Sequence, residues 1–126
     1  MIKVAPSILS ANFAYLADEV KKVTAAGADY IHIDVMDGVF VPDITLGASV
    51  VKALRPVSKA MFDVHLMVEH PEQKIEAFAR AGADSITFHV EAAVHTHRIV
   101  QQIKAAGCRA GVVLNPGTPL SCLDEI

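Results

Sequence analysis

The sequence is short of the features that mark several common classes of protein. It has two cysteines, Cys108 and Cys122, and they lack the close spacing of metal-binding cysteine pairs. We expect both thiols to be reduced and partly buried, and a single disulfide between them is the less favoured alternative. No run of about 18 apolar residues occurs, and the N-terminus lacks the basic start and long apolar stretch of a signal peptide. We therefore expect a cytoplasmic protein without membrane contact.

Positive charge is also scarce, and this bears on the possible partners. The net charge is −3 and no cluster of lysine and arginine appears, so we expect no nucleic-acid surface. About half of the residues are apolar and a fifth are charged, as in globular proteins. No Pro/Gly/Ser-rich linker, charge run or low-complexity tract divides the chain. We therefore expect one domain over residues 1–126, long enough to bury a core.

Strand-like and helix-like patterns alternate along the whole chain. Short runs rich in β-branched residues begin near positions 3, 29, 61, 84 and 109. Four stretches with helical periodicity lie between or after them, at 12–27, 46–55, 71–82 and 94–107. Asn12 is the expected N-cap of the first helix, and Pro71 suits the first turn of the third. A glycine closes three of these stretches, at Gly27, Gly82 and Gly107, as expected of left-handed caps.

A βα unit that recurs about every 23–32 residues predicts an α/β fold with parallel strands. Two architectures accept about five such strands. One is a flavodoxin-like open sheet, which suits this length. The other is a partial (β/α)8 TIM barrel, since a full barrel takes about 200–250 residues.

Two of the predicted strands carry polar residues at alternate positions. "YIHIDVMDG" places His32, Asp34 and Met36 on one face of its strand, and "FDVHLMVEH" does the same for Asp63, His65 and Met67. Consecutive βα units are usually neighbours, so we expect the two rows to lie side by side. Active sites of α/β folds gather at the carboxyl ends of such strands.

Two imidazoles and a carboxylate on neighbouring strands predict a divalent-metal site formed by His32, Asp34 and His65. Zinc, iron and manganese all suit these donors. A carboxylate beside the metal can also move a proton. The alternative is a hydrogen-bonded polar pair inside the core, which we favour less because buried polar groups are costly unless paired or ligated.

Other polar residues have simpler explanations. Asp63 is either a partner of His65 or a buried structural acid, and the two are equally favoured. His89 is expected to be a hydrogen-bonded core residue, and Asp37 precedes a glycine as in tight turns. The hydroxyl of Ser7 either faces the same cavity or caps a turn. Three histidines are assigned to loops or helix surfaces: His70, His95 and His97.

Five segments together resemble the ribulose-phosphate 3-epimerase family. They are "APSILSANF", "GADYIHIDVMDGVFVPDITLG", "FDVHLMVEHPE", "AGADSITFHVEA" and "GCRAGVVLNPGTPL", and they occur in the order of that family across nearly the whole chain. The resemblance implies a phosphate-binding (β/α)8 barrel. It also implies metal-dependent epimerisation at C3 of a ketopentose phosphate, D-ribulose 5-phosphate to D-xylulose 5-phosphate, by proton transfer through an enediolate.

The resemblance also implies roles for individual residues. His32, Asp34 and His65 match metal ligands, and Asp34 also matches a catalytic acid/base. Substrate contacts match at Ser7, Met36, His65 and Met67. Related epimerases that act on other ketose phosphates, such as allulose 6-phosphate, share these motifs.

Some motifs of the family do not occur in these 126 residues. They are the "VDGG" segment, which carries the second catalytic aspartate and a fourth metal ligand, and the phosphate-binding "NPGFGG" and "GS" loops. We therefore expect about five strands of the barrel and little or no turnover by this chain alone. We also expect a homodimer, or a higher homo-oligomer, formed through exposed sheet edges. The alternative is a non-catalytic, self-assembling metal-binding scaffold.

Overall fold

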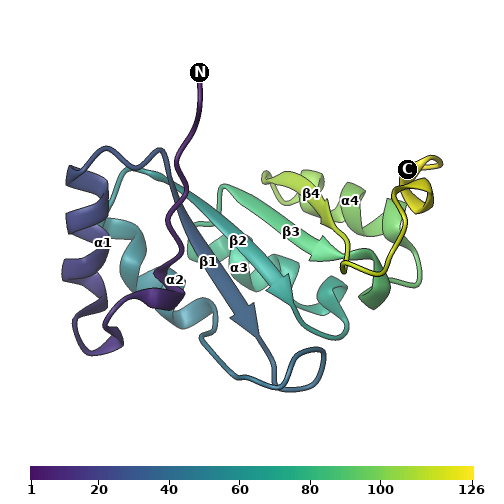
Figure 1. The fold of residues 1–126 in the computed structure, drawn as a ribbon, viewed down its shortest axis with the longest axis horizontal. Coiled ribbons are helices and arrows are strands. Elements are labelled where there is room, and N and C mark those ends of the chain that lie inside the picture. The colour runs from purple at the N-terminus through teal and green to yellow at the C-terminus, as the bar shows by residue number, and fades with distance from the viewer.

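Two neighbouring strands of the protein bury every second side chain, and this alternation sets the two layers of the fold. The computed structural model, which describes residues 1–126, contains one four-stranded sheet (Figure 1). All neighbouring pairs are parallel, and the strands follow one another in chain order: β1 (Tyr30–Met36), β2 (Met61–Met67), β3 (Ser85–His89) and β4 (Arg109–Val113). In β1 and β2, half-buried and fully buried residues alternate without a break.

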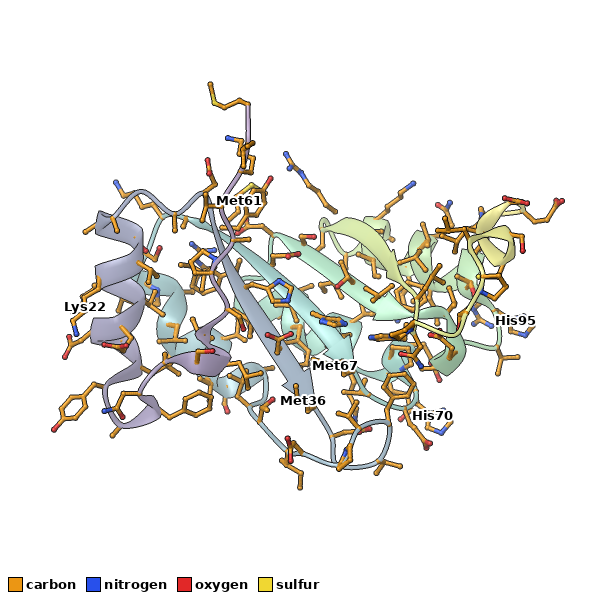
Figure 2. All side chains as sticks on the ribbon, in the orientation of Figure 1. Lys22, Met36, Met61, Met67, His70 and His95 are labelled. Atoms are coloured by element: carbon orange, nitrogen blue, oxygen red, sulfur yellow. The ribbon has the colours of Figure 1, made fainter.

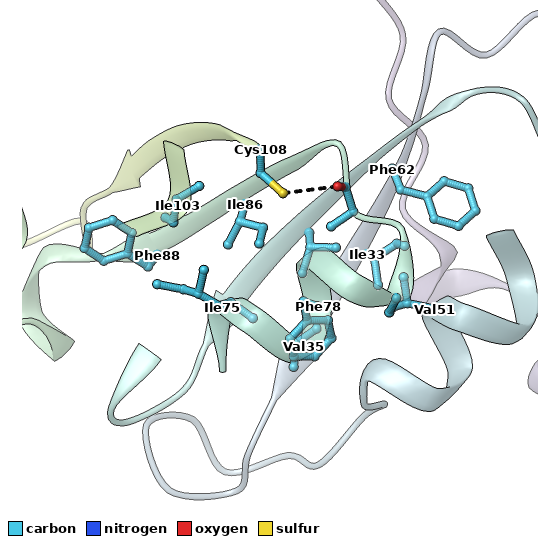
Figure 3. Close-up of a cluster of buried hydrophobic side chains, with 14 of the residues drawn as sticks. Ile33, Val35, Val51, Phe62, Ile75, Phe78, Ile86, Phe88, Ile103 and Cys108 are labelled. Carbon is cyan, nitrogen blue, oxygen red and sulfur yellow. Dashed lines mark hydrogen bonds between the residues drawn. The ribbon is translucent and has the colours of Figure 1, made fainter. Parts of the chain in front are cut away.

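The helices cover the apolar face of this sheet. Figure 1 shows α2, α3 and α4 behind the strands, with α1 beside α2 at the β1 end. Their bounds are α1 (Leu16–Ala25), α2 (Ala48–Leu54), α3 (Ile75–Ala81) and α4 (Thr96–Ala105). Strand residues such as Ile33 and Phe88 pack with helix residues such as Val51, Phe78 and Ile103 in one cluster of buried side chains (Figure 3). The other face of the sheet carries the polar rows.

This arrangement matches a portion of a barrel better than a flavodoxin-like sheet. A flavodoxin-like sheet changes strand order and carries helices on both faces. Here the order never reverses, and one face is free of helices. The fold is therefore α/β, with four parallel strands and four helices, consistent with a partial (β/α)8 barrel. None of the four helices combines the length and the apolar character of a membrane span.

The first of the five expected strands does not form as a regular strand. The N-terminal segment instead runs along the edge of β1 (Figure 1). There the carbonyl of Val4 accepts the N–H of Tyr30, and the carbonyl of Pro6 accepts the N–H of His32. A single bridge joins Ser7 to His32. Pro6 has no N–H to donate, and Val4 is 56% exposed, so the pairing is too sparse for a continuous ladder.

The predicted helices are present, with tighter turns at some ends. Asn12 caps a 3-10 turn over Phe13–Tyr15, which leads into α1, and Pro71 opens a 3-10 turn before α3. The glycines expected as left-handed caps all have positive φ angles: Gly27 at 96°, Gly82 at 109° and Gly107 at 84°. The two cysteines are free. Cys108 is buried and donates to the carbonyl of Ala83 (Figure 3), whereas Cys122 is exposed, contrary to the expectation of partial burial.

Arg55 joins the end of α2 to the start of two strands. Its guanidinium donates to the carboxylate of Asp84 at 2.8 Å and to the backbone carbonyls of Ser58, Ala60 and Gly82 at 2.6, 2.7 and 3.2 Å. It also lies over the ring of Phe62, at 3.8 Å from the ring centre. One planar cation therefore satisfies three loop carbonyls that would otherwise lack partners.

Candidate metal and acid–base site

The register of β1 and β2 brings the three predicted metal ligands together. His32 lies opposite Asp63, and Asp34 lies opposite His65, all on the face that carries no helices. One ligand atom from each of His32, Asp34 and His65 lies within 4.8 Å of the other two. The sequence prediction of this cluster is therefore confirmed as an arrangement in space.

The carboxylate of Asp34 sits between the two imidazoles. Its Oδ1 is 3.2 Å from His32 Nε2 and 3.2 Å from His65 Nδ1. The three side chains are between 13 and 26% exposed, so the cluster can be reached from one side. Two nitrogens and one carboxylate oxygen that converge in this way suit Zn²⁺, Fe²⁺ or Mn²⁺ and leave further coordination positions open.

Asp63 pairs with His32, so neither of the two expected roles, a partner of His65 or a buried structural acid, describes it: its side chain is 22% exposed. Asp63 Oδ2 is 2.8 Å from His32 Nδ1, because parallel register puts these residues directly opposite each other. This hydrogen bond raises the pKa of His32 and lowers the pKa of Asp63. It also leaves His32 Nε2 as the nitrogen that faces Asp34.

His65 has the opposite tendency. Burial lowers its pKa, and the neighbouring His89 adds to this effect, although the hydrogen bond to Asp34 opposes it. A neutral imidazole is the form that binds a metal ion. The shift in the pKa of His65 therefore favours the metal-binding form, whereas the shift in the pKa of His32 favours the form that must lose a proton before it binds.

Ser7 performs both of the roles that the sequence left open. The Ser7 hydroxyl donates to Asp34 Oδ2. The Ser7 Oγ atom also accepts the N–H of Leu9, and Ser7 thereby caps a 3-10 turn over Ile8–Ser10. The segment that runs along β1 therefore supplies a hydrogen bond to the free oxygen of the Asp34 carboxylate.

Met36 and Met67 lie opposite each other at the carboxyl ends of β1 and β2 (Figure 2). Both are half-buried on the same face as the histidines. Thr45 fixes this end of β1, since its hydroxyl donates to the carbonyl of Asp34 at 2.6 Å and accepts the N–H of Met36 at 3.0 Å. Thr45 belongs to a loop without a periodic pattern, so nothing in the sequence marks it as a neighbour of the site.

Asp37 is a turn residue, as expected, and it also joins two loops. Its Oδ1 accepts the N–H groups of Val39 and Phe40, both at 2.9 Å, and its Oδ2 accepts the N–H of Glu69 at 2.8 Å. Burial opposes ionisation, but these backbone donors hold the pKa of Asp37 below its usual value. The loop after β1 is thereby tied to the end of β2.

His89 is buried, as predicted, but it also contacts the site. Its Nε2 is 2.9 Å from His65 Nε2, and the two rings stack with centres 5.0 Å apart. The signal in the sequence was the alternation in "SITFH", which puts Ser85, Thr87 and His89 on the polar face. His65 lies opposite Thr87 in the register, so His89 is one step further along that face.

The remaining histidines lie outside the cluster. His70, His95 and His97 are exposed, as predicted. His70 and His95 line a hollow of about 920 Å³ beside Phe40, Glu91 and α4. This hollow contains none of the three candidate metal ligands.

The fold and the polar face together define a class: a barrel-type α/β protein with imidazoles and carboxylates gathered on its inner strands. The model of the Ribulose-phosphate 3 epimerase family matches residues 3–126. The chain belongs to that family.

Individual relatives support this assignment over the whole chain. The chain is 58% identical to Ribulose-phosphate 3-epimerase of Bacillus subtilis, over all of its own length and 58% of the relative. It is also 58% identical to the chloroplastic Ribulose-5-phosphate-3-epimerase of Arabidopsis thaliana, over 99% of the chain and 45% of the relative. The Escherichia coli Ribulose-phosphate 3-epimerase is 52% identical over 98% of the chain and 55% of the relative. The chain therefore spans about half the length of the curated relatives it matches.

A more distant solved structure shares the fold. Yersinia pestis DHPS with pterine-sulfa conjugate Compound 16 superimposes with a TM-score of 0.65 at 16% identity, over 97% of this chain and 48% of the other. At this level of identity the similarity concerns the fold alone.

Proposed function

We propose that this chain carries one half of a metal-dependent epimerase site for a ketopentose phosphate. The reaction is the interconversion of D-ribulose 5-phosphate and D-xylulose 5-phosphate by inversion at C3. The observation that carries the proposal is the convergence of His32, Asp34 and His65 on the inner face of the sheet. The epimerase names of the relatives support the choice of reaction.

The residues present fit a divalent cation. His32 Nε2, Asp34 Oδ1 and His65 Nδ1 would hold it, and the other nitrogen of each imidazole already has a polar partner. A divalent cation at this position would polarise the C2 carbonyl of the sugar and stabilise the negative charge that develops there. Zinc, iron and manganese are the candidates.

Asp34 would act as the acid/base on one face of the sugar. The C3–H bond breaks, its proton moves to Asp34 Oδ2, and the electron pair passes toward the C2 carbonyl to give an enediolate. The hydroxyl of Ser7 donates to this same oxygen and would orient it. Met36 and Met67 would line the site around the apolar part of the substrate, and Ser7 and His65 would contact its oxygens.

Inversion at C3 also needs an acid on the opposite face. Asp63 is the nearest other carboxylate on these strands, and its hydrogen bond to His32 occupies it. A proton that Asp34 returns to the same face regenerates the starting sugar. We therefore expect this chain alone to exchange the C3 hydrogen with solvent and to epimerise weakly or not at all.

Deuterium uptake separates proton removal from inversion. D-ribulose 5-phosphate is incubated in D₂O with the purified chain and added Fe²⁺, Mn²⁺ or Zn²⁺, and both C3 deuteration and D-xylulose 5-phosphate are measured by NMR. We expect deuteration well above any epimerisation, and its loss by about 10²-fold or more in Asp34→Asn. Asp43→Asn, the same change at an exposed loop position, should behave as the wild type. Equal deuteration with the wild type and Asp34→Asn would refute Asp34 as the base.

Two alternatives remain distinguishable in the same assay. Faster exchange with allulose 6-phosphate than with D-ribulose 5-phosphate would identify a related ketose phosphate as the substrate. Metal binding without exchange on any of these sugars would support a metal-binding scaffold without catalysis.

We also propose that the chain associates with itself. The strand β4 at one edge has no fully buried residue, although Ala110 and Val112 occupy positions that face the helices. Unpaired edges of this kind recruit further strands. A homodimer, or a higher homo-oligomer, would cover this edge.

A further inference from the structure

We propose that His89 and Glu91 are positioning residues that fix the tautomer of His65 and keep its Nδ1 free for the metal. This inference rests on the proposed metal site at His32, Asp34 and His65. The structural basis is a chain of contacts that leads away from the site: His65 Nε2 to His89 Nε2 at 2.9 Å, then His89 Nδ1 to Glu91 Oε2 at 3.4 Å.

A contact between two imidazole nitrogens admits only one hydrogen when both rings are neutral. If His65 carries its proton on Nε2, it donates to His89, and its Nδ1 lone pair faces Asp34 and the metal position. If His89 carries the proton on Nε2, it donates instead, and His65 must place its own proton on Nδ1, where it blocks coordination. The tautomer of His89 therefore decides whether His65 can bind a metal.

Glu91 selects between these two arrangements. His89 is 6% exposed, and its Nδ1 makes no hydrogen bond. The charged group that faces this nitrogen is the carboxylate of Glu91, at 3.4 Å. A proton on Nδ1 meets that negative charge favourably, whereas a bare lone pair is repelled by it. Glu91 thus favours the His89 tautomer whose Nε2 accepts from His65.

The two candidate histidine ligands are supported in parallel ways. The carboxylate of Asp63 contacts His32 Nδ1 directly, at 2.8 Å. The carboxylate of Glu91 acts on His65 through one intervening imidazole. Without a cation, Asp34 Oδ1 lies 3.2 Å from His65 Nδ1 and favours the competing tautomer, in which Nδ1 carries the proton. With a cation bound, Asp34 and His65 Nδ1 would both face the metal, and Glu91 then favours the tautomer of His65 that binds it.

The loop after β4 holds Glu91 in place. Glu91 Oε1 accepts the N–H of Asn115 at 2.6 Å and the hydroxyl of Thr118. The ring of Phe40 lies 4.9 Å from the ring of His89 and restricts its rotation. The "NPGT" segment at 115–118 therefore reaches the metal position through three side chains.

The first test is zinc affinity of the full chain, measured by competition with a chromophoric chelator. We expect His89→Leu to weaken zinc binding by about 10–100-fold. Glu91→Gln should weaken it in the same direction but less, and His89→Gln, whose amide oxygen can accept from His65 Nε2, should recover part of the loss. Thr87→Val is the matched control, because Thr87 lies on the same strand face and its buried hydroxyl has no partner.

The second test reads the tautomer directly. ¹⁵N imidazole NMR of the zinc-loaded wild type should show a His65 Nε2–H proton that is shifted downfield and protected from solvent exchange. That protection should be lost in His89→Leu and reduced in Glu91→Gln. A purely structural role for His89 would change the melting temperature without this spectroscopic change.

The outcomes separate the two proposals. Wild-type zinc affinity and an unchanged His65 signal in both His89→Leu and Glu91→Gln would overturn the positioning role and leave the metal site intact. Zinc binding that Asp34→Asn does not weaken would refute the metal site itself. If His89→Leu fails to fold, the surface change Glu91→Gln decides the question alone.

Discussion

Asp37 shows how a single carboxylate can hold two loops beside the site. Its oxygens accept three backbone N–H groups from both loops, and these donors keep its pKa low. A carboxyl group with a depressed pKa in the folded state stabilises the fold above its unfolded pKa, near about 3.9, and loses that effect as the pH falls through the folded value.

Replacement of Asp37 by asparagine should therefore cost stability in a pH-dependent way. The amide keeps one acceptor but cannot accept the N–H of Glu69, so we expect a loss of roughly 1 kcal/mol at neutral pH. The difference from the wild type should shrink as the pH falls below about 3.9. Urea unfolding at a series of pH values measures this. A constant difference at all pH values would contradict the assignment, and Asp43→Asn should show almost none.

The cluster of site residues could be predicted because strand alternation is visible in the sequence. His32 and Asp34 share a face in any strand, and so do Asp63 and His65. The pairing across strands depends on register, which alternation does not determine, and this is why neither role expected for Asp63 included His32. The alternation in "SITFH" places His89 on the polar face, but its contact with His65 depends on side-chain rotamers on two strands, which the sequence does not determine.

At the scale of elements, the helices and four of the five expected strands follow from periodicity and glycine caps. The first strand was over-predicted, since Val4 and its neighbours have the right composition but pair along one edge with few bonds. The composition of this segment indicates an extended backbone. A continuous ladder of hydrogen bonds between strands also needs backbone N–H donors, and Pro6 has none. The length of α3 was overestimated because the turn that Pro71 opens is of the 3-10 type.

The junction of α2 with the strands gives a prediction at this scale. Arg55→Lys keeps the charge but replaces a planar fork with a single ammonium, which cannot reach Asp84 and three carbonyls together. We expect a loss of about 2 kcal/mol in the free energy of unfolding, because partly buried carbonyls lose their donors. Chemical denaturation measures it. Arg80→Lys is the control, as Arg80 makes one exposed pair with Glu76. Equal effects of the two changes would refute the role of the fork.

For the whole molecule, the open edge at β4 predicts association. The chain has a mass of 13.4 kDa, and we expect light scattering after size exclusion at micromolar concentration to give at least twice this value. Dilution should lower the apparent mass, since partly buried residues of β4 become exposed again. A constant mass of 13.4 kDa across the dilution series would refute self-association.

The alternation of buried and half-buried residues in β1 and β2 has a consequence for insertions and deletions. Loss of one residue from β1 ahead of His32 would turn Ile31 and Ile33 toward the open face and drive His32 and Asp34 into the apolar layer. Point substitutions can remove the candidate chemistry and leave the fold, whereas a one-residue deletion in these strands removes both at once. Variation in chain length among natural relatives is therefore expected in the loops, with both strands kept at constant length.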